Sequence, residues 1–457
     1  MEVRKFNRFE ELVESFDQNH DNALIFEDAN FPGGKGLISY HLFRKLILNE
    51  AEEKRQKNQD VDFLRIGHAP SDLVRLFADV ITGTDVVLTD PHLPEVRFAK
   101  LKLALEPKLK ALHKKPRENK EGRIIFFTSG TTNSSKAVVL TSEALLHAAW
   151  RGQMCLPILP EDILLCELPL SHVFGFVCAM LWAITNGAAV ALSRGVRHIT
   201  DDTLFFHPTV ASLVPRLAEA LAHLHTFNPE LRVVLIGAAP LSDKQYQLVS
   251  AETKAKIFTG YGLTETASGV AITMNPNDPD SMTVCPEVDL VLAEDGEILI
   301  RTDSLLECYV TPSVLPLHKG EERPLTKDGY FATGDIGLFD PDGGLHITGR
   351  KKDMLVLPDG NKLFCPEYES ILTRDLGTDE LAIILMDGRA KLVVTDEISR
   401  EQAETAVQNL NKTLNRSVQL TDVIFIHHKL PRTVTGKLKR YLIERAIENS
   451  DYSLWEE

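Results

Sequence analysis

Short apolar runs alternate with amphipathic stretches along much of the chain, and this alternation predicts strands and helices in turn. Val61–Ile66 and Val86–Thr89 are β-branched runs typical of strands, and Ser71–Ile81 between them has helical apolar spacing. Leu204–Phe206 is expected to end another strand, and Val210–Leu224 is expected to be helical. Strand–helix–strand order at this spacing favours a parallel, doubly wound sheet.

One apolar stretch, Val173–Leu192, is nearly long enough to cross a bilayer. Asn186-Gly187 interrupts it, and Asn-Gly is a strong turn signal. We therefore expect a buried helix that ends near Asn186, followed by a strand over Ala188–Ser193. The protein is accordingly expected to be soluble, with no membrane span.

The last third of the chain has a different pattern, in which short alternating strands follow one another after Val288. Asp-Gly turns, which favour hairpins, begin at Asp295, Asp328, Asp342, Asp359 and Asp387. The fold class expected is α/β, with a large N-terminal domain (residues 1–348) of doubly wound sheets and a distorted β subdomain near 288–348. A small α+β C-terminal domain (residues 349–457) follows, with strands at Leu381–Met386, Lys391–Val394 and Val423–Ile426.

Composition excludes some classes of partner. The formal charge of −15 over 457 residues disfavours nucleic acid, which attracts a basic face. Six cysteines without a Cys-x-x-Cys pair favour reduced thiols in the cytoplasm. Met1–Glu14 is charged throughout and does not resemble a secretory signal.

The most distinctive stretch joins two expected strands, Ile124–Phe127 and Ala137–Leu140. The loop between them, Thr128–Lys136, is rich in hydroxyl side chains, contains one glycine and ends in a lysine. Backbone amides, hydroxyls and a lysine suit a polyphosphate. The loop is not a Walker loop, because it lacks Gly-Lys-Ser/Thr and a strand follows it. A Ser/Thr-rich surface hairpin is the ordinary alternative.

Five further motifs follow in order: Gly260-Tyr-Gly-Leu-Thr-Glu265, Thr333-Gly-Asp335, Gly349-Arg-Lys-Lys352, Gly360-Asn-Lys-Leu-Phe-Cys-Pro-Glu-Tyr-Glu369 and Pro431-Arg-Thr-Val-Thr-Gly-Lys437. Taken alone, each has an ordinary account as a turn, a charged hinge or a solvated basic tail. Together their order and spacing resemble the adenylate-forming superfamily of acyl- and aryl-CoA synthetases, beetle luciferases and peptide-synthetase adenylation domains. The resemblance extends from about Gly36 to Leu442 and is closest to acyl- or aryl-CoA synthetases.

The resemblance implies an ATP-dependent acid–thiol ligase. Such an enzyme joins a carboxylic acid, here fatty or aryl, to AMP with release of pyrophosphate, and then transfers the acyl group to a thiol. The cofactors implied are ATP, Mg²⁺ and CoA, or a carrier-protein phosphopantetheine in place of CoA. The partners implied are therefore a small carboxylic acid and either CoA or an acyl carrier protein.

The resemblance also implies roles for individual residues. The β- and γ-phosphates would be held by the hydroxyl loop, through Thr128, Ser129, Gly130, Thr131, Thr132 and Lys136. Tyr261 and Gly262 would lie against adenine beside Gly237, Ala238 and Ala239. Asp335 would accept both ribose hydroxyls with Arg350 in support. Glu265 would bind Mg²⁺, Thr264 would contact the α-phosphate, and the catalytic lysine would be Lys437.

Family members move their C-terminal domain after adenylation, so the resemblance implies a mobile lid. The pivot corresponds to Lys352, and the movement would carry Lys437 away so that a thiol can enter. The sequence departs from the usual loop pattern at Asn133, Ser135 and Ala137, where the family shows Gly, Pro and Gly.

Pro169-Leu-Ser-His-Val-Phe-Gly175 bears on the choice of acid. Amino-acid-activating relatives usually carry an aspartate here, and its absence disfavours an amino acid. His172 matches a histidine near the carboxylate in many acyl- and aryl-CoA synthetases, although a core histidine is the ordinary alternative. Three other functions stay open: an adenylation enzyme that loads a carrier protein, a non-catalytic nucleotide-binding relative, and a luciferase-like oxidation.

Overall fold

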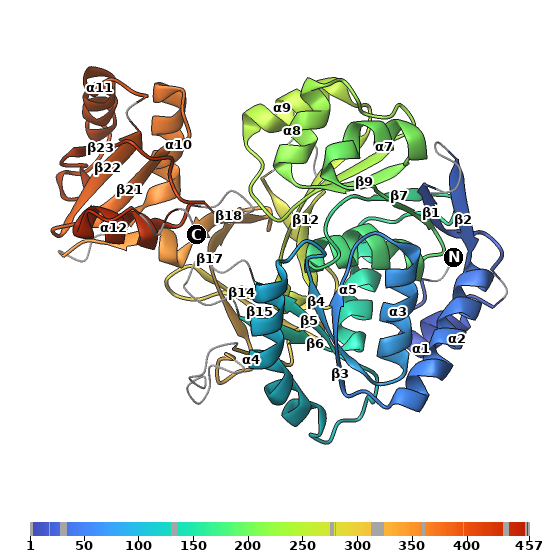
Figure 1. The fold of residues 1–457 in the computed structure, drawn as a ribbon. Helices are drawn as coiled ribbons and strands as arrows, with labels where there is room; N and C mark the ends of the chain where they lie inside the picture. Colours follow the sequence, from blue (N-terminus) through green and yellow to red (C-terminus); the bar gives the residue numbers. More distant parts are fainter. Residues whose placement is uncertain are drawn as a thin grey trace.

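The computed structural model describes residues 3–17, 19–27, 34–128, 136–274, 278, 280–311, 324–358, 362–395, 397–432, 438–452 and 455. Figure 1 shows a large α/β body, coloured blue to yellow, and a smaller body coloured orange to red. The architecture is the mixed α/β arrangement expected from the sequence.

The largest sheet has 13 strands in the described part of the chain and changes character along its width. Its parallel part contains β1 (Asn22–Glu27), β7 (Ile163–Cys166), β8 (Ala189–Leu192), β9 (Val210–Leu213), β10 (Val233–Ile236) and β11 (Lys256–Leu263), with β2 (Lys35–Ser39) antiparallel at one edge. Its antiparallel part contains β12 (Ser268–Thr273), β13 (Met282–Val284), β14 (Val288–Leu292), β15 (Glu297–Thr302), β17 (Phe331–Phe339) and β18 (Leu345–Arg350). This antiparallel part covers the region where a distorted β subdomain was expected.

A second sheet has five strands in the order β16-β6-β5-β4-β3. Their bounds are β3 (Val61–Arg65), β4 (Asp85–Thr89), β5 (Ile124–Phe127), β6 (Ala137–Leu140) and β16 (Cys308–Val310). The two strands predicted around the hydroxyl loop, β5 and β6, pair antiparallel. The loop therefore joins neighbouring strands of one sheet.

Helices separate and cover the two sheets in an α-β-α-β-α arrangement. Between the sheets lie α5 (Ser142–Cys155), the π-helix η1 (Gly175–Leu181) and α6 (Trp182–Thr185), with α1 (Phe9–Glu14), α2 (Tyr40–Lys57) and α3 (Pro70–Ile81) in the same core. The outer face of the large sheet is covered by α7 (Ile199–Phe206), α8 (Pro215–His223) and α9 (Asp243–Glu252), and that of the second sheet by α4 (Glu95–His113). Successive residues of β7 illustrate the layering, because Leu164 faces the inner core and Leu165 the outer one.

The prediction for residues 204–224 was partly wrong. Leu204–Phe206 ends the helix α7 rather than a strand, and Val210–Leu213 is the strand β9 rather than the start of a helix. All four residues of β9 are buried between β7 and β10, so the strand is buried on both faces and lacks the alternation that identifies half-buried strands. Pro215, at the first turn of α8, marks where the helix begins.

The smaller body is α+β, as expected. A hairpin of β19 (Met354–Val356) and β20 (Lys362–Phe364) precedes a sheet of β21 (Leu381–Met386), β22 (Arg389–Thr395) and β23 (Val423–Ile426). Its helices are α10 (Cys365–Leu376), α11 (Arg400–Asn411) and α12 (Arg440–Asn449). The three strands predicted here are confirmed. The predicted domain boundary at residue 349 falls inside β18, the last strand of the large sheet.

The apolar stretch at 173–192 is a buried helical segment followed by a strand, as expected. It comprises η1, α6 and β8, and most of its side chains belong to the inner core. Over the residues that the structure describes, we find no helix with the length and apolar character needed to cross a bilayer.

A buried ion pair fixes α12 against the sheet of the smaller body. Arg440 contacts both carboxylate oxygens of Glu369, with Nη2 at 2.6 Å from Oε2, and Ile383 N donates to Glu369 Oε1 at 2.5 Å. The side chains of Arg440 and Glu369 are only 12% and 11% exposed. Arg440, three residues after the motif that ends at Lys437, is therefore a structural residue.

Arg440→Ala is expected to destabilise the smaller body by about 3 kcal/mol, because it leaves a carboxylate buried without its cation. Denaturant unfolding followed by a probe in this body would measure the change. The matched control is Arg374→Ala, which breaks an exposed pair with Asp375 at 3.5 Å and should cost less than about 0.5 kcal/mol. Equal effects of the two substitutions would contradict the structural role of Arg440.

Candidate active site

The strand β11 positions the centre of the candidate site. Lys256–Thr259 pair parallel with β10, whereas Gly260–Leu263 pair antiparallel with β12. A register shift between Tyr261 and Gly262 accompanies the change of partner. A Cβ on Gly262 would lie 2.0 Å from the carbonyl oxygen of Ser268, so only glycine fits at this bulge. Thr264 and Glu265, which follow β11 directly, therefore lie at the junction of the parallel and antiparallel parts of the sheet.

Tyr261, Asp335 and Arg350, which come from three different strands, form one connected group. The Tyr261 hydroxyl donates to Asp335 Oδ2 at 2.8 Å, and Arg350 Nε lies 2.8 Å from Asp335 Oδ1. Asp335 on β17 and Arg350 on β18 are direct partners in the antiparallel register. Burial and the Asp335 charge raise the pKa of Tyr261, so its hydroxyl stays protonated and donates. Asp335 is 3% exposed, and one donor lies at each of its two side-chain oxygens.

A second group links the end of β11 to the hydroxyl loop. Thr264 and Glu265 lie in a single 3₁₀ turn, η3 (Thr264–Thr266), directly after β11. The Tyr309 hydroxyl donates to Glu265 Oε1 at 2.5 Å, and Lys136 Nζ lies 4.7 Å from the centre of the Tyr309 ring. Burial, reinforced by Glu265, raises the pKa of Tyr309. One neutral tyrosine therefore orients a carboxylate and supports a cation at the same time.

Tyr309 is a residue that the sequence analysis missed. It lies on β16, where it pairs with Val138 of β6, next to the end of the hydroxyl loop. Its position in the chain, well after Glu265 and outside every motif, gave no local signal. The only available sign was an aromatic residue in the short apolar run Cys308–Val310.

His172 and the loop after β10 lie on the opposite wall. His172 lines the cavity and is accessible to solvent, while desolvation lowers its pKa, an effect that Asp90 partly opposes. Ala238 also lines the cavity and adopts a left-handed φ of 66°. A Cβ on Gly237 would lie 2.8 Å from the Phe174 ring, so the glycine allows this loop to approach the histidine segment.

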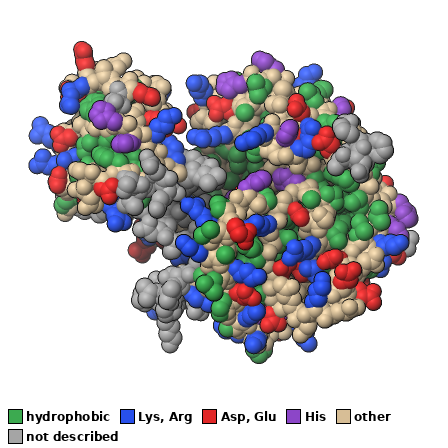
Figure 2. Space-filling model, viewed as in Figure 1, with side chains coloured by type: hydrophobic (Ala, Val, Ile, Leu, Met, Phe, Trp, Pro, Cys, Tyr) green, Lys and Arg blue, Asp and Glu red, His purple; other side chains and the backbone are tan. Residues whose placement is uncertain are grey.

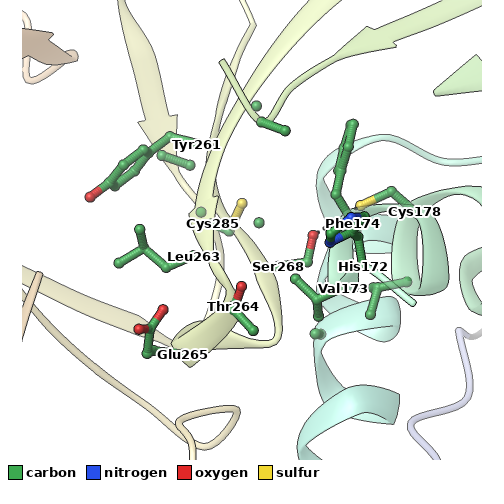
Figure 3. A pocket seen from close by; sticks show the side chains of 18 of the residues that line it. His172, Val173, Phe174, Cys178, Tyr261, Leu263, Thr264, Glu265, Ser268 and Cys285 are labelled. Carbon is green, nitrogen blue, oxygen red and sulfur yellow. Dashed lines mark hydrogen bonds between the residues drawn. The ribbon is translucent and has the colours of Figure 1, made fainter. Parts of the chain in front are cut away.

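A cavity of about 380 Å³ brings these residues together. Among the predicted site residues, those that line it are Thr128, Lys136, His172, Ala238, Tyr261, Gly262, Thr264, Glu265 and Arg350. Gly237, Ala239 and Asp335 are not lining residues, although Asp335 bonds two residues that are. Figure 3 shows Tyr261, Thr264 and Glu265 along one side of the cavity and His172, Phe174 and Cys178 on the other.

The inner part of the cavity has a different chemistry from its mouth. It is lined by apolar, small or weakly polar side chains of the inter-sheet helices and β12, namely Ala148, Ala149, Gly152, Cys155, Leu156, Val177, Cys178, Trp182 and Ala271. The residues of α5 that line this space are small, namely Ala148, Ala149 and Gly152. A Cβ added to Gly152 would lie 3.9 Å from the Trp182 ring. The charged lining residues of the described chain, Lys136, Glu265 and Arg350, lie at the other end.

Several predicted site residues lie outside the described residues. These are Ser129, Gly130, Thr131 and Thr132 in the hydroxyl loop and the expected catalytic lysine, Lys437. The backbone of Lys352 is described and lies in the 3₁₀ turn η4 (Lys351–Asp353). Its neighbour Lys351 contacts Asp295 Oδ2 and Glu297 Oε2, each at 2.8 Å. The turn is therefore tied to the large body immediately before Lys352.

Comparison with known proteins agrees with this geometry. A family model described as "AMP-binding enzyme" matches residues 48–310, more than half of the chain. The chain belongs to the AMP-binding enzyme family. The predicted family and fold class are confirmed, and the predicted enzyme class, AMP-forming acid–thiol ligases, is supported.

Relatives with assigned activities are acid–CoA ligases. A 2-succinylbenzoate–CoA ligase of Listeria monocytogenes is 29% identical over 328 residues, which cover 69% of this chain and 68% of the relative. An oxalate–CoA ligase of Arabidopsis thaliana is 25% identical over 421 residues, 87% of this chain and 78% of the relative.

Solved structures share the whole fold. ATP-bound MatB from Rhodopseudomonas palustris superposes with a TM-score of 0.79 at 20% identity, covering 97% of this chain and 99% of that one. The o-succinylbenzoate coenzyme A synthetase of Bacillus subtilis in complex with AMP gives 0.77 at 18% identity, covering 94% and 97%. The likeness extends through the smaller body as well as the large one.

Asp335→Asn is expected to weaken AMP binding about 10- to 100-fold, because hydrogen bonds to a charged group contribute about 1.5–3 kcal/mol. Isothermal titration calorimetry with AMP would measure this change. Asp340→Asn is the control, since Asp340 bonds Ser281, His346 and the turn after β17 but does not line the cavity. Unchanged AMP affinity in the Asp335 variant would rule out this carboxylate as the ribose ligand.

Proposed function

We propose that this enzyme joins an apolar carboxylic acid to CoA through an acyl adenylate. A carboxylate oxygen attacks the α-phosphorus of ATP, and the bond to pyrophosphate breaks. The thiol sulfur then attacks the acyl carbonyl carbon, and AMP leaves with the bonding electrons. The observation that carries the proposal is one cavity whose charged mouth holds the predicted nucleotide residues and whose inner end is apolar.

At the nucleotide end, Asp335 offers carboxylate oxygens to the two ribose hydroxyls, and Tyr261 offers a ring face to adenine. Arg350 neutralises Asp335, which lowers the cost of keeping this carboxylate buried. The Ala238 loop closes the other side of the base. Because Tyr261 is fixed by its bond to Asp335, base and sugar would be bound by a preformed unit.

At the phosphate end, Lys136 and Glu265 are placed for a polyphosphate and its metal ion. Carboxylate oxygens suit Mg²⁺, a hard cation that takes oxygen ligands, and Tyr309 fixes one oxygen of Glu265. Mg²⁺ bound there would supply positive charge to the phosphate oxygens. Lys136 and the hydroxyls of residues 128–135 would hold the β- and γ-phosphates, and Thr264 the α-phosphate.

The inner end of the cavity suits an uncharged acyl or aryl group. Its described lining contains no Asp, Glu, Lys or Arg, so a second carboxylate or an ammonium would lose hydration without an ion-pair partner in the lining. His172 lies between the two ends, and its lowered pKa favours the neutral ring near pH 7. The relatives act on acids as different as 2-succinylbenzoate and oxalate, so the acid class is inferred from this lining alone.

We assign residues 349–457 to a mobile lid that pivots at Lys352 and carries Lys437. The ion pairs of Lys351 with Asp295 and Glu297 support this pivot, because they hold the preceding residue on the large body. During adenylation Lys437 would bridge the acid carboxylate and the α-phosphate, and it would withdraw before the thiol step. Lys437 has no described position, so this role rests on the motif around it.

CoA is the acceptor that we favour over a carrier protein. The arginines near the end of the chain do not argue for an acidic carrier. Arg432 is paired with Asp379 and Glu380, and Arg440 with Glu369. Figure 2 shows basic and acidic side chains interspersed over the visible face. All six cysteines lie in the described part of the chain and none is in a disulfide, which agrees with a reducing, cytoplasmic setting.

The decisive experiment is mass spectrometry of reactions with ATP, Mg²⁺, CoA and a panel of fatty and aryl acids. Acyl-CoA is expected with at least one acid, together with AMP and pyrophosphate. Lys437→Ala should abolish acyl-adenylate formation but still convert supplied acyl adenylate to acyl-CoA. Acyl adenylate without acyl-CoA would point to a carrier protein, and ATP binding without pyrophosphate release would point to a non-catalytic relative.

Tyr309→Phe is expected to raise the Mg²⁺ concentration for half-maximal adenylation about tenfold, because Glu265 loses the donor that orients it. The phenyl ring would stay under Lys136, so affinity for ATP measured without metal should change little. Steady-state pyrophosphate release at varied Mg²⁺ would measure the effect.

The control for Tyr309→Phe is Tyr330→Phe. Tyr330 donates to Asp289 Oδ2 at 2.6 Å and lies under Arg301, 4.5 Å from the ring centre, yet it does not line the cavity. The same lost hydroxyl there should leave the Mg²⁺ dependence unchanged. An unchanged Mg²⁺ dependence in Tyr309→Phe would show that Tyr309 does not position Glu265.

A further inference from the structure

Two thiols meet at the inner end of the cavity. Cys155 is the last residue of α5, and Cys285 lies in the connection between β13 and β14. Both line the cavity. Arg151, one helical turn before Cys155, donates from Nε to the carbonyl oxygen of Pro286, the residue after Cys285, at 3.1 Å, so the end of α5 lies against this connection. Two segments far apart in the sequence thus place a dithiol where the apolar part of the acid would lie.

A buried cation lies next to this dithiol. Arg151, one helical turn before Cys155, is 0% exposed and is held by Asp303 Oδ1 at 2.7 Å, Ser304 Oγ at 2.9 Å and the Pro286 carbonyl at 3.1 Å. Interaction with the Cys285 thiol lowers the pKa of Cys155, and the Arg151 charge lowers it further, against the effect of burial. Interaction with Cys155 and burial raise the pKa of Cys285, so this thiol keeps its proton.

The other cavity thiol differs from this pair. Cys178 bonds the Ser268 hydroxyl at 3.1 Å, and burial raises its pKa to about 11. It has no cation such as Arg151 to stabilise a thiolate. Since the thiolate is the reactive form, Cys178 provides an internal comparison within the same cavity.

We propose that Cys155 and Cys285 form a reversible oxidation site for hydroperoxides that enter the cavity. The Cys155 thiolate attacks the terminal, hydrogen-bearing oxygen of a hydroperoxide. The sulfur–oxygen bond forms, the oxygen–oxygen bond breaks, and the leaving alkoxide takes a proton from solvent. Cys285 sulfur then attacks the sulfenic sulfur, giving a disulfide and water, with the Cys285 proton leaving in that water. Overall, two thiols are oxidised, and the hydroperoxide is reduced to an alcohol and water.

The disulfide would change the shape of the acid site. A disulfide holds its sulfurs at about 2.05 Å, so its formation pulls the end of α5 toward the β13–β14 connection. A change of one methylene's size in an apolar pocket alters kcat/KM about tenfold or more. Oxidation is therefore expected to lower kcat/KM for the acid at least about tenfold. This consequence, unlike the thiol chemistry, rests on the proposed function.

The test combines peptide mapping with activity. The full-length protein is treated with hydrogen peroxide or tert-butyl hydroperoxide, the remaining thiols are alkylated, and the digest is analysed by mass spectrometry. A Cys155–Cys285 linked peptide, lighter by two hydrogen atoms than the two thiol peptides and removed by dithiothreitol, is expected. Loss of acid-dependent pyrophosphate release should follow the same time course and reverse with dithiothreitol.

Three variants separate the pair from other thiols, each compared with its own activity before oxidation. Cys155→Ser and Cys285→Ser should each lose the reversible inactivation, whereas Cys178→Ser should keep it. Absence of the linked peptide in oxidised wild type would overturn the proposal whatever the activity shows. A linked peptide without acid-dependent activity would instead count against the proposed function and leave the oxidation site established.

Discussion

The change of partner along β11 is the constraint on which the site depends. This strand pairs parallel with β10 over residues 256–259 and antiparallel with β12 over residues 260–263, and the pairing with β12 shifts register between Tyr261 and Gly262. Tyr261 lies at that shift, and Glu265 lies in the turn just beyond it. The same strand therefore belongs to both the parallel and the antiparallel part of the large sheet. This strand brings Tyr261 to Asp335, which lies on β17 in the antiparallel part of the sheet.

The cavity has a charged mouth and an apolar inner end. Its mouth places carboxylates, a lysine and an arginine where charges meet, and each charge has a partner or a donor nearby. Its inner end, between the two sheets, is part of the main hydrophobic core. The π-helical turns at Gly175–Leu181 belong to this inner wall, and Ser212 donates to the Cys178 carbonyl within them at 2.8 Å.

The sequence predicted the parts of the fold and site that are encoded locally. The strands around the hydroxyl loop, the hairpin turns and the residues of the nucleotide motifs follow from local composition, periodicity and motif order. Tyr309 did not, because its role arises only when β16 pairs with β6, far from it in the chain. The structural role of Arg440 was not predicted for a similar reason, since an exposed basic residue and a buried ion pair look the same in the sequence until Glu369 is placed beside the arginine.

The strand at Val210–Leu213 shows the limit of periodicity itself. Buried on both faces, it has no solvent-exposed side to reveal the two-residue repeat, so its residues fitted a helical pattern as well. Only the proline that opens α8 distinguishes the two readings. Local sequence therefore specifies half-buried elements better than central ones.

Arg350 connects the nucleotide motif that contains Asp335 with the motif that contains the proposed pivot, Lys352. It is the partner of Asp335, and it lies two residues before Lys352, the residue assigned to the pivot. A displacement at the pivot that pulls on Arg350 also disturbs the carboxylate that would hold the ribose. By reciprocity, a nucleotide that stabilises this ion pair biases the orientation of the smaller body by the same free energy. Binding of the adenylate would then be coupled to the orientation of the smaller body through the Arg350 guanidinium.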